Sequence, residues 1–100
     1  MKEIVVLPLA HDEILDVLIR LDDLREELSN ECKRALEESL LFLSRFPEAS
    51  PVSKFPPLRR TIIQKFSLGV FYSITGKRVF IHAVLDLRQD PQWIRRRLQG

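Results

Sequence analysis

Basic and proton-exchanging side chains recur along the second half of the chain, at positions where they could act on a phosphate group. Arg59, Lys65 and Arg88 supply guanidinium and ammonium groups, while Tyr72 and His82 supply groups that can exchange a proton. Guanidinium and ammonium groups bind phosphate oxygens, and an aromatic ring can stack on an unpaired base. These residue types therefore suit a surface that binds RNA, phosphates or an acidic protein.

Each of these residues also has a structural interpretation. Tyr72 lies among apolar neighbours, which fits a core aromatic better than an acid, and His82 interrupts an apolar strand, which fits a structural histidine better than a catalytic one. The basic residues could serve only as a solvated face of a sheet. The further candidates for contact with a target or a phosphate are Arg60, Lys77 and Arg78.

The sequence lacks the motifs of the common enzyme classes, since it has no Gly-rich phosphate loop, no HExxH and no CxxC. Cys32 is the single cysteine and falls on an apolar helical stripe, so a buried structural thiol is expected. No metal and no cofactor are expected. Asp86 and Arg88 fall on one side of their strand and can pair with each other, which needs no substrate.

Length and composition predict one domain over residues 1–100, soluble and cytoplasmic, with no membrane contact. The chain is 45% hydrophobic and 30% charged, and it has no apolar run of membrane-spanning length. Charge is divided unevenly: residues 1–50 have six Lys/Arg against twelve Asp/Glu, and residues 51–100 have ten against two. A basic half suits phosphates or an acidic partner, although the two halves could also attract each other across the fold.

Periodicity predicts an α+β fold in the order β-α-α-β-β-β-α. A short strand covers residues 3–7, and apolar residues then step by three and four from 11 to 46, with a break near Arg25–Asn30 that gives a helical hairpin. Residues 46–57 hold four prolines and form a loop. Strands at 58–66, 69–74 and 78–87 form an antiparallel meander, and Asp90–Pro91 begins a short helix. The hairpin is expected to pack on this small, mainly antiparallel sheet.

Several short motifs follow one another along this second half. They are Arg59–Arg60, Lys65–Phe66, Phe71–Tyr72, Gly76 and Arg88–Gln89–Asp90–Pro91. The acidic hairpin before them ends in LFLSRFPE. This order resembles that of the RelE/ParE-superfamily toxins of bacterial type II toxin–antitoxin systems, over residues 2–97 and most clearly over 58–91.

The resemblance implies a compact toxin whose partner is a cognate antitoxin, with which it forms a hetero-oligomer. RelE-like members cut mRNA in the ribosome, and ParE-like members poison DNA gyrase. For cleavage, the resemblance implies a catalytic set of Lys65, Tyr72, His82 and Arg88. Target or phosphate contact then falls to Arg59, Arg60, Lys77 and Arg78.

Two positions depart from the pattern of the family. Asp86 stands where many of these toxins have a histidine, and Ser67 stands where they have a proline after the Lys-Phe pair. Because a histidine acid is missing at Asp86, the leading hypothesis is a ParE-like toxin that binds gyrase or another protein. An mRNA interferase is the alternative, and a non-toxic binding domain is a third possibility.

Overall fold

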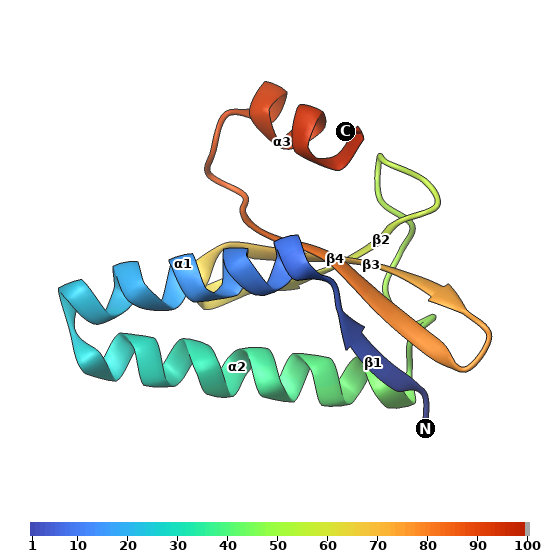
Figure 1. Cartoon of the computed structure of the whole chain (residues 1–100), viewed down its shortest axis with the longest axis horizontal. Coiled ribbons are helices and arrows are strands. Elements are labelled where there is room, and N and C mark those ends of the chain that lie inside the picture. Colours follow the sequence, from blue (N-terminus) through green and yellow to red (C-terminus); the bar gives the residue numbers. More distant parts are fainter. Residues whose placement is uncertain (100) are drawn as a thin grey trace.

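The computed structural model describes residues 1–99 and confirms the expected α+β order of elements (Figure 1). Within these residues, no helix is both long and apolar enough to cross a membrane. The elements are β1 (Glu3–Val6), α1 (Pro8–Leu24), α2 (Glu26–Arg45), β2 (Arg59–Ile63), the 3-10 turn η1 (Gln64–Phe66), β3 (Leu68–Thr75), β4 (Arg78–Asp86) and α3 (Pro91–Gln99).

A single extended residue separates the two helices of the hairpin. Arg25 has φ −161° and ψ 135°, and its N–H donates to a carbonyl of the last turn of α1 at 2.9 Å. Glu26 and Glu27 follow in the first turn of α2, where carboxylates interact favourably with the helix dipole. The break therefore falls where the sequence predicted it. Helix α1 begins at Pro8 rather than at residue 11, because proline suits the first turn of a helix.

The sheet has the strand order β1-β4-β3-β2, with β1 parallel to β4. Strands β2, β3 and β4 form the predicted antiparallel meander, and the β3–β4 hairpin turns at Gly76, which has φ 59°. Strand β2 is shorter than predicted, since it ends at Ile63 rather than at residue 66. Its continuation winds into η1, and Ser67 closes this turn in the left-handed conformation at φ 51°.

A β-bulge in β4 decides which side chains reach each face of the sheet. Tyr72 pairs with Ile81 and Phe71 pairs with Ala83, so His82 is an extra residue without a partner on β3. Side chains alternate along a strand, and the extra residue reverses that alternation for the rest of β4. One core, with Tyr72 and Ile81, lies between the sheet and the helical hairpin, and a smaller core, with Phe71 and Ala83, lies between the sheet and α3. The helical hairpin and α3 lie on opposite faces of the sheet (Figure 1).

Two charged side chains cover an open edge along the second half of β4. Strand β1 pairs with β4 only as far as Ile81. Beyond that point, Glu13 of α1 accepts the N–H of Val84 at 3.2 Å. Arg97 of α3 donates to the carbonyl of His82 at 2.8 Å. Glu13 and Arg97 also pair with each other through two hydrogen bonds, at 2.9 and 3.0 Å, so they join α1, β4 and α3.

The substitution Glu13→Gln tests this junction. It leaves the Arg97 guanidinium, which is only 20% exposed, without a counter-charge. We expect the free energy of unfolding, measured by urea denaturation, to fall by about 2 kcal/mol. Glu3→Gln is the matched control, because its partner Arg78 is 62% exposed and the loss should stay below about 0.5 kcal/mol. Equal losses in the two variants would contradict an anchoring role for Glu13.

Candidate functional site

A cleft of about 340 Å³ lies where α1, η1 and the end of β4 meet, and we name it the α1–β4 cleft. Its apolar lining comprises Val17, Leu21, Leu24, Leu28, Phe66 and Leu68. Its charged lining comprises Arg20, Lys65, Asp86 and Arg88. A second hollow of about 400 Å³ adjoins it along α1 and shares Val17, Arg20 and Asp86. The cleft therefore combines a long apolar surface with a charged rim.

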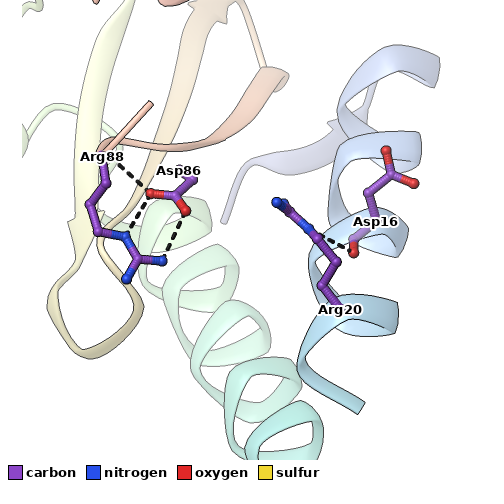
Figure 2. A network of polar contacts seen from close by, with 4 residues as sticks. All are labelled: Asp16, Arg20, Asp86 and Arg88. Carbon is purple, nitrogen blue, oxygen red and sulfur yellow. Dashed lines mark hydrogen bonds and ion pairs between the residues drawn. The ribbon is translucent and has the colours of Figure 1, made fainter. Parts of the chain in front are cut away.

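Arg88 and Asp86 form the ion pair that their spacing allowed (Figure 2). Nε and Nη2 of Arg88 donate to the two carboxylate oxygens of Asp86 at 3.0 and 2.9 Å, and the backbone N–H of Arg88 donates to Oδ1 at 2.9 Å. The Asp86 side chain is 16% exposed and the Arg88 side chain is 72% exposed. Hydrogen bonds from Arg88 hold the pKa of Asp86 below its ordinary value, so the carboxylate is ionised at neutral pH.

Lys65, the second predicted cation in the cleft, also pairs with a carboxylate of its own chain. It lies in η1 and its ammonium group donates to Glu31 of α2. The hydrogen bond from Lys65 and its charge lower the pKa of Glu31. The ammonium group is 5.8 Å from the centroid of the Phe66 ring, within the range of a cation–π contact. The predicted residues Lys65 and Arg88 therefore share the cleft.

Arg20 is a cleft residue that the sequence did not single out. Its Nε donates to the backbone carbonyl of Asp16 at 3.4 Å, and its guanidinium lies on the side of α1 that faces Asp86 and Arg88 (Figure 2). The charge of Arg20 contributes to the lowered pKa of Asp86. In the sequence, Arg20 stands next to Leu21 of an apolar helical stripe. Many solvated arginines have such a neighbour, so this position did not mark Arg20 as a functional residue.

Tyr72 lies away from the cleft, in the core between the sheet and the helical hairpin. Its side chain is 0% exposed, and its hydroxyl donates to the carbonyl of Pro47 at 2.7 Å. This contact connects the centre of β3 to the loop that follows α2. The placement agrees with the core aromatic that the apolar neighbours of Tyr72 suggested.

His82 lies on the opposite face of the sheet, the face that α3 covers. Its Nε2 is 2.8 Å from the hydroxyl oxygen of Ser73 on β3, and both residues line a hollow together with Leu58 and Leu98. Burial, assisted by the charge of Arg97, lowers the pKa of His82 below its ordinary value. The bulge thus separates His82 from the cleft, and the four predicted catalytic residues occupy three different places.

The four residues predicted to contact a target or a phosphate are also distributed along the sheet. Arg59 donates to the carbonyl of Ser50 at 2.7 Å, and Arg60 is exposed on the same edge strand. Lys77 and Arg78 lie at the β3–β4 hairpin, at the opposite end of β4 from Asp86. A strand of this length separates the two ends by about 25 Å. These cations therefore do not join the α1–β4 cleft.

The substitution Tyr72→Phe tests the structural role of the hydroxyl. It leaves the carbonyl of Pro47 without its partner in a buried position, so we expect the free energy of unfolding to fall by about 1–2 kcal/mol. Urea denaturation measures the change. An unchanged free energy of unfolding would show that water replaces the hydroxyl and that the contact does not stabilise the fold.

The lowered pKa of His82 predicts a pH-dependent stability. As the pH falls below the ordinary value of 6.5, the unfolded chain takes up a proton on this histidine before the folded chain does. The His82 contribution is therefore present at neutral pH and is lost progressively as the pH falls below 6.5. Urea denaturation across this range should show a smaller decrease for His82→Gln than for the natural sequence. His11→Gln, at an exposed position on α1, is the control and should retain the full decrease.

Comparisons with known proteins bear on the fold. A scan against protein-family models found no match, and a search of curated proteins found none either. Among solved structures, a chain of the "Chromosomal ParDE TA system from P. aeruginosa" is similar, with a TM-score of 0.73 over 84% of this chain and 94% of that chain. The sequence identity is 15%, so the likeness is one of fold. The chain therefore shares its fold with a chain of that ParDE system, which confirms the fold that its motifs predicted.

Proposed function

We propose that this chain is the toxin of a type II toxin–antitoxin module. In this proposal it inhibits growth by binding a protein, DNA gyrase or another target, and a cognate antitoxin neutralises it. The fold supports the proposal, because the similar solved structure is described as a ParDE TA system.

The observation that favours protein binding over RNA cleavage is the dispersal of the candidate catalytic set. Cleavage needs a proton acceptor, cations and a proton donor around one phosphate. Here Tyr72 is buried under the hairpin and His82 lies under α3, while Lys65 and Arg88 line the α1–β4 cleft. In this arrangement the cleft offers cations without a neutral proton donor. Such a surface can bind a partner more readily than it can complete the reaction.

The lining of the α1–β4 cleft supports a protein partner. Leu21, Leu24 and Leu28 line it along the hairpin, and Leu24 remains 71% exposed. Contiguous apolar surface with a charged rim is typical of a protein-binding site. Arg88 and Lys65 stand at that rim, and each keeps N–H groups that its own ion pair does not use and that can donate to polar groups of a partner segment. Target and antitoxin would then compete for the same residues.

The alternative is a RelE-like mRNA interferase. It would use Lys65 and Arg88, the two predicted cations of the α1–β4 cleft, on the phosphate. Its proton donor would be a residue other than Tyr72 and His82. A non-toxic binding domain is the third possibility, and the experiment below distinguishes all three.

Expression of the chain in a bacterial host tests the proposal. We expect growth arrest with a DNA-damage response and intact mRNA. Arg88→Ala and Lys65→Ala should each relieve the arrest at least about tenfold, measured as surviving colonies, because each removes a charged rim contact. Arg78→Ala is the matched control: it also removes an exposed, ion-paired arginine, but at the far end of β4, and it should leave the arrest unchanged.

Each other outcome identifies one of the alternatives. Arrest with mRNA cut at ribosome-dependent positions supports the interferase and rejects the protein-binding proposal. Absence of arrest, with the chain present and folded, rejects both toxic activities. Full arrest by both Arg88→Ala and Lys65→Ala would show that the α1–β4 cleft is not the site.

A further inference from the structure

Two of the three cations that line the α1–β4 cleft form ion pairs with carboxylates of the same chain. Arg88 is held by Asp86, and Lys65 is held by Glu31. Arg20 is the third cation of the cleft, and its Nε donates only to a backbone carbonyl in the hydrogen bonds found within residues 1–99. A cleft with three cations would attract polyanions, yet two of the three are neutralised within the fold.

The Asp86 carboxylate lies where a phosphate would bind to Arg88, so it can block phosphate binding by its position as well as by its charge. An arginine recognises a phosphate through two parallel N–H groups of its planar fork. In Arg88 the Nε and Nη2 groups form such an edge, and the two oxygens of Asp86 fill it at 3.0 and 2.9 Å (Figure 2). The backbone N–H of Arg88 fixes the carboxylate from a third direction at 2.9 Å. The exposed arginine is thus bound by a well-anchored acid, and its recognition edge is closed.

We infer that Asp86 is a specificity-determining residue that excludes phosphate diesters from the α1–β4 cleft. It occupies the fork of Arg88 where two phosphate oxygens would bind, and its charge repels the phosphate. The inference rests on the proposed function, because it explains how a cleft with three cations selects a protein over RNA. It goes beyond that proposal because it assigns the preference for a protein over RNA to one residue, Asp86. Without Asp86, the guanidinium groups of Arg20 and Arg88 would form an anion site.

The substitution Asp86→Asn tests this assignment. Asparagine keeps an oxygen that can accept the Arg88 N–H, so the turn after β4 can remain, but the counter-charge is lost. The probe is a short fluorescein-labelled single-stranded RNA, titrated at several salt concentrations and followed by anisotropy. We expect the variant to bind about tenfold more tightly than the natural sequence, with a salt dependence of log K steeper by about 0.7 for each additional phosphate contact.

Three further variants make the result specific. Glu3→Gln adds the same charge by releasing Arg78, an exposed arginine at the far end of β4, and it should change RNA affinity less than about twofold. Asp86→Asn combined with Arg88→Ala should return to the affinity of the natural sequence. Glu31→Gln releases Lys65 in the same cleft from an exposed pair. It should increase RNA affinity in the same direction as Asp86→Asn, so the test does not depend on one variant folding well.

Either of two results would overturn the inference. One is an equal gain from Asp86→Asn and Glu3→Gln, which would reduce the effect to net charge. The other is unchanged RNA binding by a folded Asp86→Asn variant, whatever the result for Glu31→Gln. These measurements use purified protein and RNA, so they are independent of toxicity. If the chain fails to arrest growth while Asp86→Asn gains RNA affinity, the proposed function fails and the role of Asp86 stands. If the chain arrests growth while Asp86→Asn gains no RNA affinity, the role of Asp86 fails and the proposed function stands.

Discussion

The hydrogen-bonded ion pair between Glu13 and Arg97 is the interaction on which the rest of the structure depends. Strand β1 leaves β4 after Ile81, and an unpaired strand edge costs stability wherever water cannot reach it. Glu13 satisfies the N–H of Val84, and Arg97 satisfies the carbonyl of His82. The pair therefore fixes α1 and α3 against the same stretch of β4. The α1–β4 cleft begins at the end of that stretch, between α1 and Asp86.

Ion pairs within the fold balance part of the charge difference between the two halves of the sequence. Three of the four ion pairs within residues 1–99 join the acidic N-terminal half to the basic C-terminal half, and these are Glu3–Arg78, Glu13–Arg97 and Glu31–Lys65. The basic half is therefore less available to a polyanion than its composition implies. Arg60, Arg95 and Arg96 remain exposed, and the described chain places each of them in no ion pair. Attraction between the two halves of the sequence is therefore a feature of this fold.

The order of elements could be predicted from the sequence, because prolines, glycines and apolar periods mark it. The Asp86–Arg88 pair and the turn at Gly76 could also be predicted from the sequence, since both depend on local spacing. The bulge at His82 could not be predicted. Strand β4 lies in the middle of the sheet with both faces covered, so its residues are apolar on both sides and alternation gives no sign of an extra residue. The bulge separates His82 from the cleft, and residue spacing therefore could not assemble the site.

Mapping of mRNA 5′ ends on translating ribosomes with the purified chain tests the central claim most directly, because it observes the chemistry itself. Binding of a protein target predicts intact mRNA at chain concentrations well above those of the ribosomes. The separation of Tyr72 and His82 from Lys65 and Arg88 predicts the same result. Cuts at ribosome-dependent positions that disappear in Arg88→Ala would contradict the claim, since they would show that the α1–β4 cleft completes the reaction on RNA.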